Sequence, residues 1–338
     1  MRGKINKLLI KIFPFYKRAV NRCLFLEKEI LKTSNILDDI DKRYFQEIDK
    51  EHVKRQYMLL FGKEINLENP ETFNEKLQWL KIYQRDPVMS IMSDKYRVRE
   101  FLKERGCGQY LNELYGVYNN IEELINDLDS FPDQFVVKVN HNCGGVYIVR
   151  DKKRINFHKL YELEKMLSIN NYTKTISKRL SLSGKMGNEF FRQCEWNYKN
   201  IEPCLIVEKY LENYNNSLYD YKLFCFNGEV KYIQVDIDRF TNHKKCFYDI
   251  NWEKQPFTIK HPMSDKKIPK PLNFDKMVEI AEMLSAGYPH LRVDMYNIEG
   301  NIIFGEFTFY HGSGVYKFYP EYWDMKFGEF IDLNGIPC

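Results

Sequence analysis

The pattern of hydrophobic and polar positions divides the chain into a helical first part and a strand-rich remainder. Residues 27 to 60 are charged and follow a helical period. Thr72 predicts the capped start of a helix within residues 70–84. A further helix is expected from Lys95 to Arg105, ending at Gly106. The first hundred residues should therefore be mainly helical.

From Pro132 onward the pattern changes to short strands. The β-branched run 135–139, the glycine-rich stretch Asn140 to Gly145 and the apolar run 146–149 predict a hairpin. The near-continuous apolar run Cys204 to Glu208 predicts a buried strand. Further strands are expected at 221–226, 230–236, 246–250, 292–296 and 301–309, with turns at Asn227-Gly228 and Glu299-Gly300 and a helix at 273–286.

Composition excludes several classes of protein. The 338 residues are 44% hydrophobic and 29% charged, which is typical of a packed globular chain and not of a disordered one. The net charge of +4 is too small to indicate a nucleic-acid partner over the whole surface. Eight scattered cysteines without a CxxC pair indicate neither a disulfide framework nor a zinc site. With no run of about 18 apolar residues, we expect a soluble, unsecreted protein in a reducing cytoplasm.

Residues 1–26 form a basic amphipathic segment. They contain seven Lys or Arg residues and no acid, and Ile5, Leu8, Ile12 and Phe13 recur near helical spacing. Such a segment can lie on an anionic membrane surface. It can equally be a helix packed on the body of the protein, and Pro14 interrupts its pattern early. The sequence leaves these two alternatives open.

Lys138 lies inside the short apolar strand at 135–139, where an ammonium group is costly unless it meets an anion. The nearby Gly144 and Gly145 allow backbone N–H groups to approach phosphate oxygens closely. A nucleotide triphosphate would satisfy both features. In the alternative interpretation, Lys138 points to solvent from an edge strand. The chain has no GxxxxGK[ST] motif, which excludes a P-loop.

Asp294 and Glu306 lie on the two strands of the final predicted hairpin. Counted inward from the turn at Gly300, they can face each other across the ladder, where paired carboxylates repel unless a cation lies between them. Magnesium, which prefers oxygen ligands, is the expected cation. Arg292 shares the strand face of Asp294 and would hold an anion that develops there.

Other acids leave a second enzyme class open. Glu208 and Asp220, at strand ends, could bind an adenine edge or ribose hydroxyls. Asp236 and Asp238 form a DxD pair after an apolar strand, a feature with which many nucleotide-sugar glycosyltransferases bind manganese and a diphosphate. His141, His243 and His311 show no metal-ligand spacing and are interpreted as ordinary polar residues with at most a substrate contact.

The order of these elements resembles the ATP-grasp superfamily over roughly residues 50 to 330. The segments that carry the resemblance are Asp94-Lys95-Tyr96, 135–138 with Gly144-Gly145, 206–211, Asp220, 292–294 and 306–308. More narrowly, the segment from Asn69 to Trp79 and the ending Gly305-Glu306-Phe307-Thr308 resemble the TupA-like ATP-grasp family, named for teichuronopeptide synthesis.

The resemblance implies a set of site residues. Lys95 and Lys138 would contact the phosphates of ATP, under a mobile lid that contains Gly144 and Gly145. Lys222 and Arg239 would contact phosphate or acyl phosphate, and Arg292 the oxyanion of the intermediate. The adenine pocket would be lined by Glu208, Lys209, Tyr210 and Leu211, the ribose would meet Asp220, and two Mg²⁺ ions would bind Asp294, Glu306 and Thr308, the last standing where most members have an asparagine.

The resemblance also implies a fold and a reaction. The expected fold is a mixed α+β or α/β ATP-grasp fold in four segments: a basic N-terminal segment (1–50), a helical subdomain (51–130), a lid (131–207) and an antiparallel C-terminal subdomain (208–338). The expected reaction is ATP-dependent joining of a carboxylate and an amine through an acyl phosphate, in bacterial surface polysaccharide synthesis. The substrates would be a uronic acid and an amino acid or amine, in the cytoplasm. A lipid-linked glycan at the inner face of the membrane and a soluble nucleotide-sugar suit the basic N-terminus equally.

Overall fold

The computed structural model describes residues 34–142, 144–167, 193–212, 218–237, 242–334 and 336. The basic segment 1–26, Asp238 and Arg239 lie outside these residues. The chain divides into two compact units, residues 1–56 and 57–338. Helix α3 (Ser34–Phe61) spans the boundary, and every candidate site residue belongs to the second unit. None of the described helices is long and apolar enough to cross a membrane.

Short helices open the second unit: α4 (Phe73–Tyr83), α5 (Pro87–Ser93), α6 (Val98–Glu104) and α7 (Ile121–Asn126). The predicted cap is confirmed, because the Thr72 hydroxyl accepts from the backbone N–H of Glu75 in a complete capping box. Helix α6 begins three residues later than predicted. The Asp94 carboxylate accepts from the N–H groups of Tyr96 and Arg97 and holds them in a turn.

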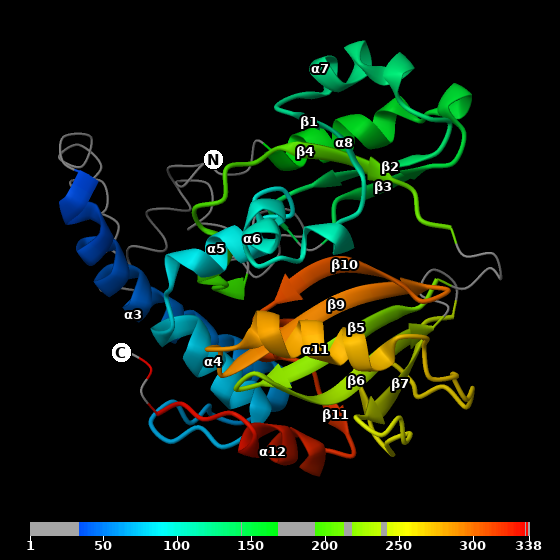
Figure 1. The fold of residues 1–338 in the computed structure, drawn as a ribbon. Helices are drawn as coiled ribbons and strands as arrows, with labels where there is room; N and C mark the ends of the chain where they lie inside the picture. Colours follow the sequence, from blue (N-terminus) through cyan, green and yellow to red (C-terminus); the bar gives the residue numbers. More distant parts are fainter. Residues whose placement is uncertain are drawn as a thin grey trace. The chain divides into compact units, whose positions relative to one another are not determined.

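A four-stranded antiparallel sheet follows, in the order β1-β4-β2-β3. Its strands are β1 (Leu114–Tyr118), β2 (Phe135–Val139), β3 (Val146–Val149) and β4 (Leu205–Lys209). The predicted hairpin at 135–149 is confirmed, and helix α8 (Phe157–Leu167) covers it (Figure 1). Because β4 and β3 flank β2, Lys138 does not lie on an edge strand.

A five-stranded antiparallel sheet carries the second half of the chain, in the order β10-β9-β5-β6-β7. Its strands are β5 (Asp220–Phe226), β6 (Glu229–Ile237), β7 (Lys244–Asp249), β9 (His290–Ile298) and β10 (Asn301–Thr308). The remaining elements are β8 (Thr258–Ile259), α11 (Phe274–Ser285), β11 (Phe318–Tyr319) and α12 (Tyr322–Glu329). The strands and turns predicted from residue 221 onward are confirmed to within a few residues.

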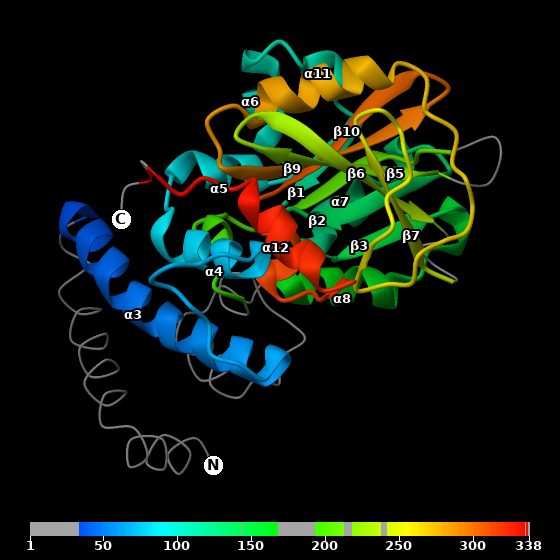
Figure 2. The same cartoon turned by 90° about the horizontal axis from the view of Figure 1, so that it is seen from below.

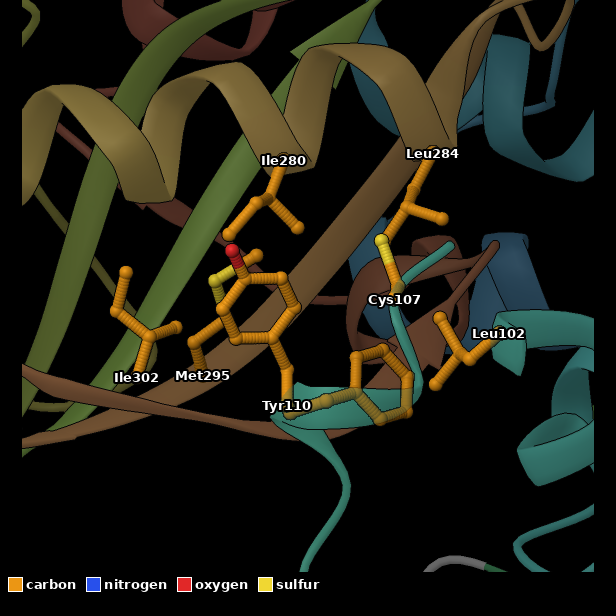
Figure 3. A pocket seen from close by; sticks show the side chains of 8 residues that line it. Leu102, Cys107, Tyr110, Ile280, Leu284, Met295 and Ile302 are labelled. Carbon is orange, nitrogen blue, oxygen red and sulfur yellow. The ribbon is translucent and has the colours of Figure 1, made fainter. Parts of the chain in front are cut away.

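The two faces of the five-stranded sheet are covered by different helices. Helix α11 lies across one face (Figure 1). There Ile280 and Leu284 meet Met295 of β9 together with Cys107 and Tyr110 (Figure 3), with no room for a water molecule. Because side chains alternate along a strand, this apolar face leaves the opposite face to Lys222 and Arg292.

That opposite face is aromatic at one end. Phe224 and Phe226 of β5 contact Phe327 of α12 with ring centroids 5.8 Å apart, and Phe73 of α4 lies 5.5 Å from the same ring. Figure 2 shows α4 and α12 side by side. Offset and edge-on contacts of this kind add to the stabilisation from apolar burial, so this end of the sheet fixes the strands that carry charges at the other end.

Gly328 is the closest point between α12 and the start of α4. A Cβ atom there would lie 2.0 Å from the Glu71 carbonyl oxygen and 2.8 Å from the Thr72 carbonyl carbon. Gly328→Ala should therefore lower the free energy of unfolding by about 2–3 kcal/mol, because backbone atoms must move. The midpoint of urea denaturation measures this loss.

Gly108→Ala is the matched control. Its Cβ atom would first meet the flexible Lys103 side chain, at 3.1 Å, so a change of no more than about 0.5 kcal/mol is expected. Equal midpoints for the two variants would contradict the close packing of α12 on α4.

Candidate active site

A β-bulge at Gly305 brings Asp294 and Glu306 together. From the turn, Phe304 is opposite Met295, but the next pair is Glu306 with Asp294. Without the extra residue, Glu306 would point to the other face of the sheet. A Cβ atom at Gly305 would lie 3.1 Å from the Asp294 carbonyl oxygen, so the bulge favours glycine. The prediction that the two acids face each other is confirmed.

Arg292 lies beside these acids, as predicted from its strand face. Its Nε and Nη2 atoms donate to the two oxygens of Asp294 at 2.6 and 2.7 Å, and Nη2 also donates to Thr308 Oγ1 at 2.8 Å. Glu306 Oε1 is 3.8 Å from Nη2. Burial lowers the pKa of Arg292, but Asp294 and Glu306 offset this and leave that pKa above its usual value. The guanidinium therefore stays charged.

Lys222 of β5 joins the same group from the neighbouring strand. Its ammonium is 2.5 Å from Asp220 Oδ2, 2.6 Å from Asp294 Oδ2 and 4.0 Å from Asp236 Oδ2. Burial alone would lower its pKa, and the carboxylates raise that pKa above the ordinary value. Arg292 and Asp294 of β9 and Lys222 and Asp220 of β5 thus form a row of charges that runs across the sheet.

The row of charges continues onto β6 and β7. Asp236, opposite Lys245 in register, accepts from Gln234 at 2.8 Å and lies 3.3 Å from His243 Nε2. Burial raises the pKa of Asp236, but Lys222 and Lys245 offset this and hold that pKa below its usual value. Lys245, Gln234 and His243 were not predicted as site residues, although polar residues at alternate positions of the apolar β6 are a usable signal.

His311 contacts the Arg292 guanidinium. Its Nδ1 lies 2.6 Å from Arg292 Nη1, and burial followed by the Arg292 charge lowers the pKa of His311 well below its ordinary value. A neutral imidazole accepts the guanidinium N–H. The sequence interpretation of His311 as an ordinary polar residue missed this contact, since no spacing rule connects positions 292 and 311.

Helix α4 holds the turn that carries His311. This turn, η5 (His311–Gly314), has Ser313 in the left-handed region at φ 58°. The Lys81 ammonium donates to Ser313 O and Oγ, and the Gln78 amide donates to the carbonyls of Ser313 and Gly314. Gln78, one of the polar residues in the segment 69–79, therefore fixes the turn that carries His311.

Lys138 and Glu208 form an ion pair between β2 and β4. Lys138 Nζ is 2.7 Å from Glu208 Oε2, and Arg99 Nη1 is 3.2 Å from Glu208 Oε1. The anion that Lys138 was expected to meet is thus a protein carboxylate in this structure, and the lysine is partly exposed. The pair brings together a residue predicted to bind phosphate and one predicted to bind adenine.

Lys95 connects the glycine-rich loop to the metal-ligand candidates. Its Nζ donates to the Asn142 carbonyl at 2.8 Å and lies 3.7 Å from Glu306 Oε2. Asn140 is buried and bonded to Asp94 and to the Glu202 carbonyl. The first part of the loop is therefore fixed to the body of the unit.

Gly144 and Gly145 both have positive φ angles, 105° and 59°. Gly144 is exposed, whereas a Cβ atom at Gly145 would lie 2.2 Å from a methyl carbon of Val139. The loop therefore requires glycine at Gly145 for backbone and packing reasons. Its exposed part is the stretch that could contact a phosphate.

A cleft of about 670 Å³ adjoins the end of β4. Three residues predicted to line the adenine pocket, Lys209, Tyr210 and Leu211, line it together with Ile298 and Ile303 of the last hairpin. Its size is that of an ordinary small-molecule site. Glu208 does not line this cleft and faces Lys138 instead.

The oxygen ligands available for magnesium are few. In the part of the chain that the structure describes, no three His, Cys, Asp or Glu side chains form a ready metal cage. Asp294 and Glu306, with the Thr308 hydroxyl two register pairs further on, nevertheless fit magnesium, which proteins usually hold with one or two carboxylates and substrate phosphates.

Comparison with protein families decides the assignment. A family model described as TupA-like ATPgrasp matches residues 75–332, which include every site residue discussed above. The chain belongs to the TupA-like ATP-grasp family. This match confirms the predicted family and the mixed α+β ATP-grasp fold.

No curated protein matches the chain, but many solved structures do. They include D-alanine–D-alanine ligase from Bacillus anthracis complexed with ATP (18% identity, 65% of this chain and 56% of that chain, TM-score 0.35) and the same enzyme from Helicobacter pylori (16%, 78% and 70%, 0.37). Another is the ATP-grasp ligase PsnB with Mg and ADP (12%, 70% and 57%, 0.36). The chain spans little more than half the length of the Bacillus anthracis ligase and of PsnB.

The stability of the TupA-like chain should depend on pH through Lys245. Burial lowers the pKa of Lys245 to about 8, whereas an unfolded lysine titrates near 10.4. The unfolded chain therefore binds this proton more tightly, and the charged ammonium lowers stability at pH 7 by roughly 3 kcal/mol, a cost that disappears as the pH rises from about 8 to about 10.4. Lys245→Met should raise the free energy of unfolding at pH 7, and the gain should shrink toward pH 10.

Urea denaturation at the two pH values measures this difference. Lys231→Met, at a partly exposed lysine of β6, is the control and should leave stability nearly unchanged at both. A Lys245→Met variant that is less stable than the unmodified chain at pH 7 would contradict the prediction.

Proposed function

We propose that this TupA-like chain is an ATP-dependent ligase that joins a carboxylate to an amine through an acyl phosphate. The observation that carries the proposal is the row of charges on one face of the five-stranded sheet: Glu306 and Asp294 as metal ligands, with Arg292 and Lys222 directly beside them. The row can neutralise a transferring phosphoryl group and then hold an oxyanion at the same place.

In the first step, a carboxylate oxygen of the substrate attacks the γ-phosphorus of ATP, and ADP leaves. Lys95 and Lys138 contact the phosphates and offset their charge, the first from a position 3.7 Å from Glu306. Mg²⁺ held by Asp294 and Glu306, with the Thr308 hydroxyl, supplies further neutralisation of phosphate charge when bound. The product is an acyl phosphate and ADP.

In the second step, the amine nitrogen attacks the acyl carbon and inorganic phosphate leaves. The tetrahedral intermediate carries an oxyanion, and Arg292 is the cation placed to stabilise it. Lys222 and Arg239 contact the phosphoryl group, and the amine gives up one proton as the amide forms. His311 keeps the guanidinium in position through its 2.6 Å contact.

We propose that the nucleotide lies between the end of β4 in the four-stranded sheet and the last hairpin of the five-stranded sheet. Lys209, Tyr210 and Leu211 would line the adenine, in the cleft that they share with the last hairpin. Glu208 would accept from the adenine amino group after releasing Lys138 to the phosphates, and Asp220 would bind the ribose. Gly144 and Gly145 would close over the phosphates and keep water from the acyl phosphate.

The substrate class is proposed from the family alone. A family associated with teichuronopeptide synthesis suggests a uronic acid as the carboxylate and an amino acid or amine as its partner, in capsule, O-antigen or related surface polysaccharide synthesis. The basic segment 1–26 would suit a lipid-linked glycan at the inner face of the membrane. No nucleic-acid partner is proposed.

Glu306→Gln tests the ligase directly. It preserves side-chain size but removes the charge that holds the cation, so ADP release with uronic acids and amino acids should fall at least about 100-fold. Calorimetry should show weakened Mg-ATP binding. Glu299→Gln makes the same chemical change at the turn of the same hairpin, outside the site, and should leave both measurements unchanged.

Two outcomes would contradict the ligase. Undiminished ADP release by Glu306→Gln would remove the metal role of Glu306. A nucleotide-sugar reaction that survives Glu306→Gln and is lost in Asp236→Asn would replace the ligase by a glycosyltransferase.

A further inference from the structure

Lys245 is a buried cation with little to balance it. Only 4% of the residue is exposed, and its Nζ donates one long hydrogen bond, 3.4 Å, to Gln234 Oε1. Among the residues that the structure describes, no carboxylate oxygen is placed within 4.0 Å of this ammonium. Burying an ammonium without a counter-ion is costly, so an apolar side chain here would give a more stable protein.

The nearest acid, Asp236, is already used by other groups. It accepts from Gln234 at 2.8 Å and lies 3.3 Å from His243 and 4.0 Å from Lys222. Lys222 is in turn closer to Asp220 and Asp294. Asp236 therefore shares its charge among several groups, and Lys245 makes no ion pair with it within 4.0 Å.

Two imidazoles lie near Lys245. The rings of His243 and His261 lie 4.0 Å apart. Burial first, and then the neighbouring His243, Lys245 and Lys260, lower the pKa of His261, whereas Asp236 raises it. An anion bound here would be attracted by Lys245 and could accept hydrogen bonds from both rings.

Lys245 also has a defined place relative to the reacting centre. It lies on the same face as Asp236, its register partner, three strands away from Asp294 in the order β9-β5-β6-β7. At about 4.8 Å per strand, the strands β9 and β7 are roughly 14 Å apart, and Lys245 lies two residues along β7 from Phe247, the residue level with Asp294. A substrate longer than one sugar ring, with its carboxylate at Arg292, can extend its far end toward Lys245.

We propose that Lys245, with His243 and His261 beside it, binds a second oxyanion of the acceptor substrate, a phosphate or carboxylate separate from the carboxylate that is activated. This inference depends on the proposed ligase function only because that function places the reacting carboxylate at Arg292. It predicts that the substrate whose carboxylate is activated carries a second anionic group at its opposite end.

A different role for Lys245 is that of a base that takes the proton from the attacking amine. The two roles differ in what arginine can replace. A guanidinium keeps the positive charge for an oxyanion but does not accept a proton at neutral pH. Lys245→Arg and Lys245→Met therefore separate charge from basicity.

The test is calorimetric titration of inorganic phosphate, and in parallel malonate, into the full chain saturated with Mg²⁺ and a non-hydrolysable ATP analogue, which occupies the nucleotide phosphate positions. The dissociation constant of at least one anion should rise about tenfold or more in Lys245→Met. It should change much less in Lys245→Arg and not at all in the control Lys231→Met. The anion that responds tells whether the second group is a phosphate or a carboxylate.

Three outcomes would overturn the proposal: no binding of either anion by the unmodified chain, equal binding by Lys245→Met, or loss in Lys245→Arg as complete as in Lys245→Met. Failure of the ATP analogue to bind would count against the ligase instead. The anion titration is then repeated on the nucleotide-free chain, where loss of binding in Lys245→Met alone still supports the oxyanion site.

Discussion

The carboxylate of Asp294 is the point on which the site depends. It accepts two hydrogen bonds from Arg292 and one from Lys222 while almost fully buried. In an interior of low dielectric constant, removing any one of these charges would leave the others without compensation. The positions of β9 and β5 are therefore fixed to each other by charge on this face and by apolar packing against α11 on the other.

One extra residue in β10 makes this arrangement possible. The register of the last hairpin would otherwise send Glu306 to the apolar face, toward α11, where a carboxylate would have no partner. The candidate site thus depends on the bulge at Gly305, in keeping with the frequent occurrence of bulges beside active sites. The bulge also explains how a strand with an apolar first half can place a carboxylate beside Asp294 near its end.

The sequence predicted individual helices, strands and turns better than it predicted the contacts between elements that are distant along the chain. The strands at 135–139 and 146–149, the cap at Thr72 and the turn at Glu299-Gly300 follow from local signals, and the structure confirms them. The bulge, the His311 contact and the burial of Lys245 without a close ion pair depend on which strands become neighbours, which local periodicity does not encode. β1 was missed because it is short, Gly116 interrupts it, and its residues show no alternation of apolar and polar positions.

The hydrogen bonds from α4 to the end of the chain also have a consequence for synthesis. Gln78 binds carbonyls of Ser313 and Gly314, and Asn74 binds the carboxylate of Asp324, 250 positions later. A ribosome completes α4 long before these partners exist. The turn that carries His311, and with it the orientation of Arg292, can therefore be set only after residue 314 has been synthesised, so a chain terminated before that point would contain Lys95 and Lys138 and still lack an ordered turn behind Arg292.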